Sequence, residues 1–176
     1  MKALSLSGHK IMFVAVLICL TAAWSISASA VVQKQTGKAV NTVTVVTENE
    51  LSFIGSTSFQ NVANATVKVT VPAGKIQLVR AEFSADSSCQ GSFAENFCQV
   101  KILADAVEMT PVSGGDFAFD GVGNADDFFE AHAMQGSILL GPGTHIIQVK
   151  AAVTLAGMSF FFDDWSLTVT QYNNGK

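Results

Sequence analysis

The sequence contains few charged residues, and positive charge is the scarcer sign. Lysine and arginine together number ten among 176 residues, against 14 acidic residues, and Arg80 is the only arginine. Nucleic-acid binding needs clustered lysine and arginine to neutralise phosphates, so the composition argues against this class of function. The low charge and the 49% of hydrophobic residues exclude a disordered chain, and the length fits one domain.

Several motifs of catalytic and nucleotide-binding sites are also missing. The sequence has no G-x-S-x-G nucleophile elbow, no phosphate-binding glycine loop and no stretch of helical periodicity. A serine hydrolase triad would have to use His132 or His145 as its base. Glycoside hydrolysis needs paired carboxylates beside a cleft, which a small sandwich rarely presents. We therefore expect a protein that is not an enzyme and that requires no cofactor.

Residues 1–30 have the pattern of a secretory signal peptide. Lys2 and Lys10 give a positive start, Ile11–Ala23 is apolar, and Ala28–Ala30 supplies a small-residue cleavage site. A membrane-spanning helix needs about 20 apolar residues, so we predict cleavage rather than an uncleaved anchor. The mature chain then has eight basic and 14 acidic residues, a net charge of −6, and is secreted, periplasmic or at the cell surface.

Two cysteines remain after the predicted cleavage, and they lie close together in the sequence. Two cysteines in an exported chain most often pair, which predicts a disulfide between Cys89 and Cys98. Their spacing is not the C-x-x-C of redox proteins. Neither His132 nor His145 stands at a metal-ligand spacing from them, so a metal site that uses these cysteines is not expected.

Apolar and polar residues alternate through most of the mature chain. In Thr66–Val71 three valines alternate with threonine and lysine, and the turn residues Pro72–Gly74 follow. Similar strand patterns occupy Val40–Thr47, Lys75–Ser84, Val100–Leu103, Met134–Leu140, Thr144–Val153 and Phe161–Thr170. Short strands between Gly/Pro turns predict one antiparallel, jelly-roll-like β-sandwich over residues 40–173. Residues 31–39 are predicted to be a flexible lead, with an edge strand as the alternative.

The last predicted strand places a carboxylate among apolar side chains. Asp163 shares the parity of Phe161 and Trp165, which we expect to face the core. A buried carboxylate needs a partner, and Arg80 is the natural one, so we predict an Arg80–Asp163 ion pair. Alternatively, a β-bulge just before Trp165 shifts the parity and puts Asp163 in solvent.

One recurring pattern covers residues 79–169. It consists of the runs Val79–Ser84, Phe97–Leu103, Asp116–Asp120, His132–Met134, Gly143–His145 and Asp163–Val169, together with Cys89. This pattern resembles uncharacterised secreted bacterial β-sandwich proteins with one disulfide. The resemblance implies a compact sandwich with a single disulfide bond, and it implies no particular activity.

Acidic residues gather in a segment rich in glycine and phenylalanine. They are Asp116, Asp120, Asp126, Asp127 and Glu130. Calcium takes carboxylate and carbonyl oxygens from flexible loops, although the spacing here is not that of an EF-hand. The simpler interpretation is that these acids solvate a long loop.

Two functions are therefore expected. The first is a secreted, non-catalytic β-sandwich with a structural or interaction role, whose partner is another protein, a glycan or a second copy. The alternative is a calcium- or carbohydrate-binding module that uses the acidic segment 116–130. Neither nucleic-acid binding nor stable membrane insertion after cleavage is expected.

Overall fold

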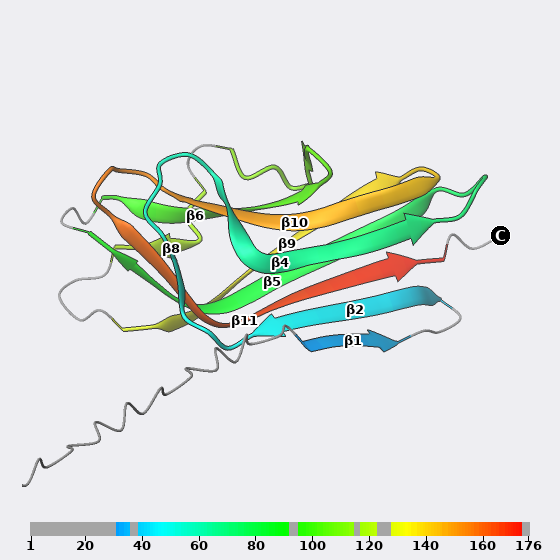
Figure 1. The fold of residues 1–176 in the computed structure, drawn as a ribbon. Helices are drawn as coiled ribbons and strands as arrows, with labels where there is room; N and C mark the ends of the chain where they lie inside the picture. The colour runs from blue at the N-terminus through cyan, green and yellow to red at the C-terminus, as the bar shows by residue number, and fades with distance from the viewer. Residues whose placement is uncertain (1–30, 36–38, 92–94, 115–116, 123–127, 174–176) are drawn as a thin grey trace, which may run out of the picture.

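The computed structural model describes residues 31–35, 39–91, 95–114, 117–122 and 128–173, where all regular elements are β-strands (Figure 1). The strands are β1 (Val31–Gln35), β2 (Val40–Glu48), β3 (Ser52–Ile54), β4 (Gln60–Val71), β5 (Gln77–Gln90), β6 (Phe97–Ala104), β7 (Val107–Glu108), β8 (Asp120–Gly121), β9 (Glu130–Leu140), β10 (Gly143–Val153) and β11 (Ser159–Tyr172). In these ranges no helix is long and apolar enough to cross a membrane. The predicted signal peptide, residues 1–30, lies outside them.

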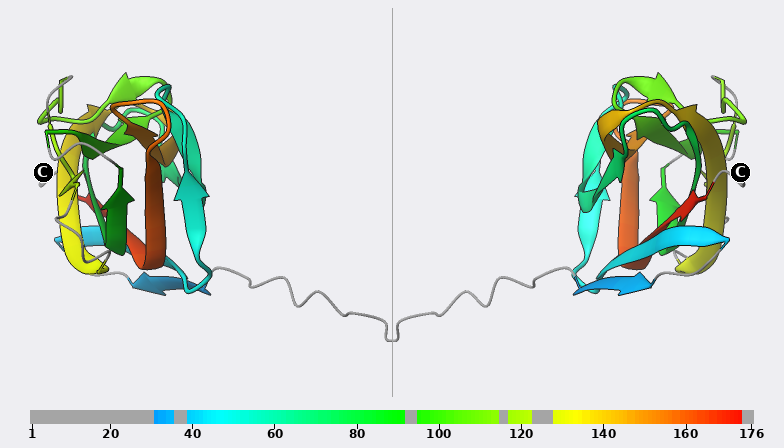
Figure 2. Two further views of the ribbon diagram at one scale, coloured as in Figure 1. Left: turned by 90° about the vertical axis from the view of Figure 1, so that its left-hand side faces the viewer. Right: turned by 90° about the vertical axis from the view of Figure 1, so that its right-hand side faces the viewer.

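The strands pair as nested hairpins that are rolled into a sandwich. β2 pairs with β11, β4 with β10, β5 with β9 and β6 with β7, all antiparallel, so each pair encloses the next. Pairing of β11 with β5 and of β10 with β6 joins the hairpins into a six-stranded and a five-stranded sheet. The two sheets face each other, as the end-on views of Figure 2 show. This is a jelly roll, and the predicted antiparallel sandwich is confirmed.

The chain ahead of β2 also belongs to the sheet. Val31–Gln35 forms β1, which pairs antiparallel with β2 at the edge of the six-stranded sheet. The predicted flexible lead is therefore wrong for these residues, and the edge-strand alternative is confirmed. Backbone hydrogen bonds to β2 order the segment although it carries few apolar residues. Residues 36–38 of the predicted lead lie outside the described part of the chain.

Alternate side chains of both sheets fill the space between them. From β5, Val79, Ala81 and Phe83 point inward and are fully buried. From β10 in the opposite sheet, Ile147 and Val149 do the same. The alternation of apolar and polar residues thus becomes an inner apolar face and an outer polar face on each sheet.

A β-bulge in β11 decides which phenylalanines reach this core. The register between β11 and β5 shifts between Asp163 and Ser166, and Asp164 has a φ of 43°. An extra residue at a bulge reverses the parity of the strand on its two sides. Phe160 and Phe162, before the bulge, are consequently fully buried.

The same bulge overturns two expectations about the last strand. Trp165 faces the core as predicted, but Phe161 lies on the outer face, where its ring centroid is 5.7 Å from that of Phe53. Asp163 is also on the outer side and only partly buried. The bulge alternative for Asp163 is therefore confirmed, and the inward position is wrong.

The segment after β7 closes one side of the sandwich. It crosses from the five-stranded sheet to β9, where Thr110 and Ser137 exchange two backbone hydrogen bonds of 2.9 and 2.8 Å. Met109, at the start of this crossing, is buried against Gly136. A Cβ at position 136 would lie 2.8 Å from the Met109 Cβ, so glycine permits the close approach.

Candidate functional site

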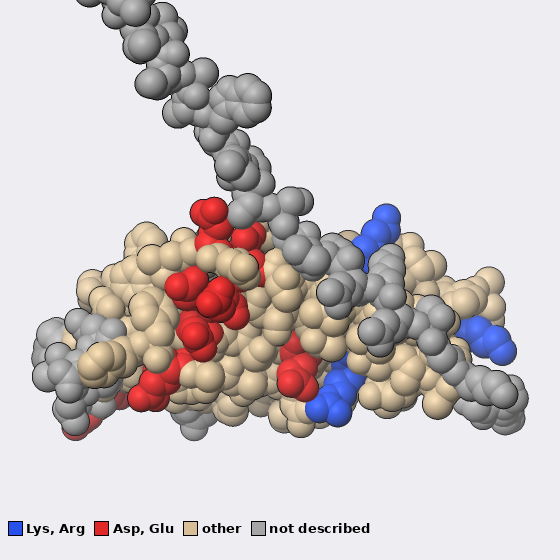
Figure 3. Space-filling model, turned by 90° about the horizontal axis from the view of Figure 1, so that it is seen from below, with Lys and Arg blue, Asp and Glu red and all other residues tan. Residues whose placement is uncertain are grey.

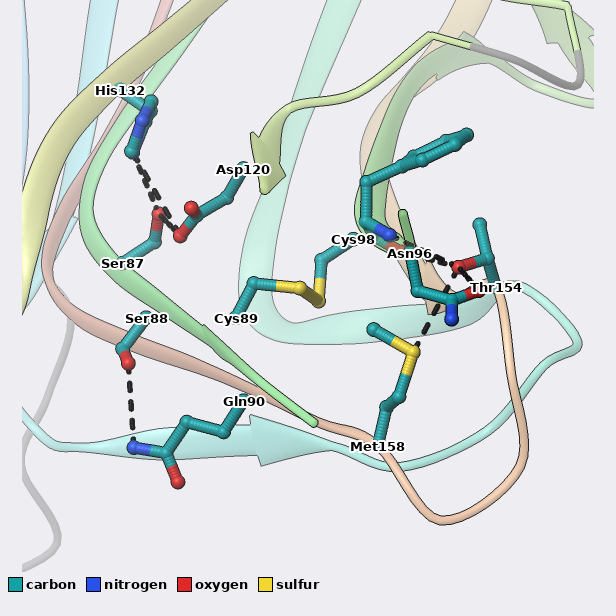
Figure 4. The surroundings of a disulfide bond; sticks show 11 residues. Ser87, Ser88, Cys89, Gln90, Asn96, Cys98, Asp120, His132, Thr154 and Met158 are labelled. Atoms are coloured by element: carbon teal, nitrogen blue, oxygen red, sulfur yellow. Dashed lines mark hydrogen bonds and ion pairs between the residues drawn. A yellow bond between two sulfur atoms is a disulfide. The ribbon is translucent and has the colours of Figure 1, made fainter. Parts of the chain in front are cut away.

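Three polar side chains from both sheets meet beside the disulfide (Figure 4). Ser87 comes from β5, His132 from the neighbouring β9, and Asp120 from β8 in the opposite sheet. The Ser87 hydroxyl donates to Asp120 Oδ2 at 2.7 Å and lies 3.0 Å from His132 Nδ1. The three side chains point toward one another and form a polar cluster in the space between the sheets.

The contacts of this cluster fix where its protons lie. A hydroxyl has one proton, and Ser87 gives it to the Asp120 carboxylate, so its oxygen accepts from His132 Nδ1. The backbone carbonyl of Glu130, 3.1 Å from the same nitrogen, can also only accept. Nδ1 therefore carries a hydrogen, and Nε2 faces the Glu130 carboxylate at 4.0 Å.

Burial raises the pKa of the Asp120 carboxyl above its ordinary value. The hydrogen bond from Ser87 and the charge on His132 act in the opposite direction, and they do not cancel the effect of burial. The cluster thus contains a carboxyl group that is held partly out of water.

This arrangement differs from a Ser-His-Asp triad. In a triad the acid orients the imidazole nitrogen that is remote from the serine, and the other nitrogen takes the serine proton. Here Asp120 and His132 both contact Ser87, and the hydroxyl proton points to the carboxylate. Ser87 is also only 1% exposed. The geometry suits a link between the two sheets.

Cys89 and Cys98 form the predicted disulfide, with Cα atoms 5.8 Å apart. Cys89 belongs to β5 in one sheet and Cys98 to β6 in the other, so the bond ties the sheets together. Asp120 lies opposite Cys98 in the pairing of β8 with β6. The disulfide and the polar cluster therefore join the sheets at the same place.

Three of the five predicted calcium ligands, Asp116, Asp126 and Asp127, lie outside the described residues. Asp120 Oδ2 is 3.9 Å from His132 Nδ1, and Glu130 Oε2 is 4.0 Å from Nε2 of the same ring. In the described part of the chain, no group of three or more His, Cys, Asp or Glu side chains could hold a metal ion. Calcium binding by this segment stays a prediction.

Arg80 and Asp163 do not form the predicted ion pair. Asp163 lies opposite Asp86, which is six residues further along β5 than Arg80. At about 3.3 Å per residue this is roughly 20 Å along the sheet. Arg80 instead lies 3.4 Å from Glu82 Oε2 and donates to Gln135 on the outer face. Both residues lie on the outer side of the sheet, and the prediction fails because strand pairing places them far apart along it.

The second described histidine sits between two acceptors. His145 Nδ1 is 3.0 Å from Asp105 Oδ2, and Nε2 is 3.0 Å from the Gly141 carbonyl. The hydrogen bond to Asp105 and that to Gly141 raise the pKa of His145. The backbone N–H of Ile146, followed by the His145 ring, lowers the pKa of Asp105. Both shifts favour the charged forms of the pair.

Carboxylates gather on the outer side of the six-stranded sheet. We call this surface the acidic face and define it by Asp86, Asp163 and Asp164. Asp86 and Asp163 occupy directly opposed positions on β5 and β11, and the bulge adds the exposed Asp164 beside them. Acidic side chains cluster on this side of the molecule in Figure 3.

The outer side of the five-stranded sheet has the opposite sign. We call it the lysine face and define it by Lys68, Lys101 and Lys150. Lys101 and Lys150 are directly opposed on β6 and β10, and Lys68 is exposed on β4. Lys101 also lies 3.2 Å from Glu108 and 4.5 Å from the centroid of the Phe59 ring.

The acidic face was not predicted from the sequence because the strand that begins at Lys75 was predicted to end too early. The strand predicted to stop at Ser84 continues as β5 to Gln90, which brings Asp86 opposite Asp163. The outward position of Asp86 could have been found by extending the alternation of β5 past Ser84. The signal for the bulge was the carboxylate of Asp163 at a position of inward parity, which allowed either a buried ion pair or a bulge.

Comparison with known protein families and with curated proteins gives no match for this chain. The likeness to secreted bacterial β-sandwich proteins with one disulfide therefore stays a prediction.

Proposed function

We propose that this chain is an exported, non-catalytic β-sandwich that associates with copies of itself, the acidic face of one molecule contacting the lysine face of the next. One observation carries the proposal. Each outer face holds a like-charge pair at directly opposed positions, Asp86 with Asp163 and Lys101 with Lys150, and the two faces differ in sign.

Such pairs are unfavourable in an isolated sheet, and in the lysine pair Glu108, 3.2 Å from Lys101, offsets only part of the repulsion. Like charges directly opposite each other across two strands repel, since their Cβ atoms are only about 5 Å apart. A surface of the opposite charge placed over each pair reverses the sign of this contribution. A molecule that carries one pair of each sign can supply the complementary surface to its own copies.

Exposed apolar side chains accompany the charges on both faces. Phe53 and Leu139 are 59% and 65% exposed on the outer side of the six-stranded sheet, and Ile146 is 38% exposed on the other. Stable interfaces combine apolar side chains with a polar surround. Both faces thus carry exposed apolar side chains, in addition to charges, that an interface would bury.

The geometry of the two faces favours open-ended assembly. They lie on opposite sides of one sandwich, so contact between unlike faces uses two different surfaces of each molecule. A contact of this kind leaves one acidic and one lysine face free at the ends of any assembly that does not close into a ring. The proposed role is therefore that of a building unit outside the cytoplasm.

Two features support export. The Cys89–Cys98 bond is of a kind that persists in oxidising compartments. The sequence pattern of residues 1–30 is that of a signal peptide, which would deliver the chain to such a compartment.

Light scattering after size-exclusion chromatography of the exported protein tests self-association. We expect assemblies at low ionic strength, where the Debye length is about 30 Å, and smaller species near 1 M salt, where it is about 3 Å. A strict monomer at high protein concentration and low salt contradicts the proposal.

Charge reversal tests which surfaces meet. Asp86→Lys puts a lysine on the acidic face, and Lys150→Glu puts a carboxylate on the lysine face. In each variant alone the altered face matches its unaltered partner face less well, so each should assemble less than the wild type. An equimolar mixture should assemble again, because every contact can then join unlike faces. If both variants are folded but their mixture does not assemble, the pairing of these two faces is contradicted.

A further inference from the structure

A groove runs beside β9, between this strand and the segment that follows β7. It consists of two adjoining hollows of about 240 and 270 Å³, and both have Pro111 and Gln135 in their walls. Ligand sites in proteins usually measure about 300–1,000 Å³, a range that the two hollows reach together. None of the residues predicted from the sequence as calcium ligands lines it.

The walls of the groove are held in place by hydrogen bonds. The exchange between Thr110 and Ser137 fixes one end of the crossing segment to β9. The Glu108 carboxylate accepts from Ser113 N at 2.7 Å and from the Ser113 hydroxyl. Burial raises the pKa of Glu108, but the bonds from Ser113 and Lys101 outweigh it and lower the pKa overall, so the anchor is ionised. A wall that is already ordered costs little free energy to organise for a ligand.

Most residues that line the first hollow are polar, and one of them is charged. The hollow is lined by Arg80, Thr110, Gln135 and Ser137 among others. Glu82, 3.4 Å from the Arg80 guanidinium, offsets its charge. Guanidinium and amide groups are planar and offer several donors or acceptors in fixed directions. The hollow therefore favours a neutral ligand with closely spaced hydroxyl groups over an anion.

The second hollow is mainly apolar. Pro111, Val112, Phe117 and Met134 line it, with Gln135 at the boundary to the first. Val112 and Phe117 are 64% and 41% exposed, so apolar surface remains accessible there. An aromatic ring in this position can cover a flat C–H surface of a ligand.

We infer that this groove binds a neutral saccharide, with the C–H face of one sugar ring on Phe117 and hydroxyl groups at Gln135 and Arg80. A sugar ring combines an apolar face with hydroxyls at its rim, and these are the two chemistries that the hollows present side by side. A fatty acyl chain would leave the polar groups of the first hollow unpaired, which is costly. A phosphate or carboxylate would gain less from Arg80, because Glu82, 3.4 Å from the guanidinium, already offsets its charge.

A titration followed by ¹H–¹⁵N correlation spectra tests the inference on the full chain. The probes are glucose, galactose, mannose and N-acetylglucosamine, with their linear oligosaccharides, and sodium phosphate and decanoate for comparison. We expect saccharide-dependent shifts at the backbone amides of Phe117, Ala133 and Gln135. Gln135→Ala and Phe117→Ala should each weaken binding about 5- to 10-fold, since each removes one contact worth about 1 kcal/mol.

Two matched variants serve as controls. Gln148→Ala removes a surface glutamine from the opposite sheet, and Phe53→Ala removes an exposed phenylalanine from β3. Both should bind as the wild type does. The inference is overturned if no saccharide shifts the groove amides at millimolar concentration, if the shifts map elsewhere, if only phosphate or decanoate binds, or if the controls lose affinity equally. The groove residues are not those that define the two charged faces, so this outcome is separate from that of the self-association tests.

Discussion

Several buried polar residues of the described chain find partners in the opposite sheet. Ser87 bonds to Asp120 of the opposite sheet. Elsewhere the Asn64 side chain of β4 donates to Glu48 of β2 at 3.1 Å. The Gln171 amide of β11 donates to the Thr70 carbonyl of β4 at 3.2 Å. A slip of one sheet over the other would leave these groups unpaired in the interior, which costs about 1–3 kcal/mol for each. The links therefore define how the sheets are aligned.

The pair of His145 and Asp105 should make the stability depend on pH. The folded state raises the pKa of His145, so its contribution is complete below the ordinary value of 6.5 and is lost as the pH rises through the folded value. The pKa of Asp105 is lowered, so its contribution to stability is present above the ordinary 3.8 and is lost as the pH falls through the folded value.

Urea unfolding of wild type and His145→Gln compares the stability of the two proteins across both pH ranges. The stability of His145→Gln should not show the decrease that the wild type shows as the pH rises through the folded pKa of His145. The control variant Thr144→Ala should still show this decrease. An identical decline in His145→Gln would count against the pair.

At the scale of elements, local alternation predicts a strand well and its irregularities poorly. The valines of Thr66–Val71 face the core in β4 as expected, because period-2 apolar positions have only one face to bury. In β11 the same alternation predicted that Phe161 faces the core, whereas Phe160 and Phe162 are the buried residues. The aspartate at an inward-parity position permits a bulge but does not select it over a buried ion pair, since the positive φ of Asp164 depends on pairing with β5.

The crossing segment that walls the groove depends on the absence of a side chain at Gly136. Gly136→Ala should lower the free energy of unfolding by about 1–3 kcal/mol, because the new methyl group would collide with Met109. Gly141→Ala is the matched control, since a Cβ there meets nothing within 4 Å. Urea unfolding measures both. Equal stability of the two variants would show that the crossing can move aside.

At the scale of the whole molecule, the decisive contacts join residues that are distant in sequence. The jelly-roll class follows from strand number and turns, but the sequence does not state which strands pair. The groove illustrates the limit: its walls come from residues 110–117 and 133–137, with Arg80 from a third segment. Each segment looks ordinary by itself, and the site exists only after non-local pairing. The disulfide was predictable because only two cysteines follow the predicted signal peptide.

Removing the disulfide should weaken the protein without unfolding it. Cys89→Ser with Cys98→Ser should reduce the free energy of unfolding by about 2–3 kcal/mol, as expected for a short closed loop. The fold should persist, because the polar links along the sandwich still join the sheets. Guanidinium unfolding with circular dichroism gives both results. The wild type under reducing conditions should match the double variant, and a difference between them would indicate an effect of the serines themselves.

The nested pairing of strands also sets an order in which the protein can fold. β6 and β7 are separated by a tight turn, so their pairing closes little chain and loses little entropy. β2 and β11 pair from near opposite ends of the domain, and Tyr172 must be available before the register with Val40 can form. Assembly from the inside outward therefore leaves the outermost pair until last. A chain with this requirement stays incomplete until its final strand is available, and on the proposed export route that is only after the last strand has crossed the membrane.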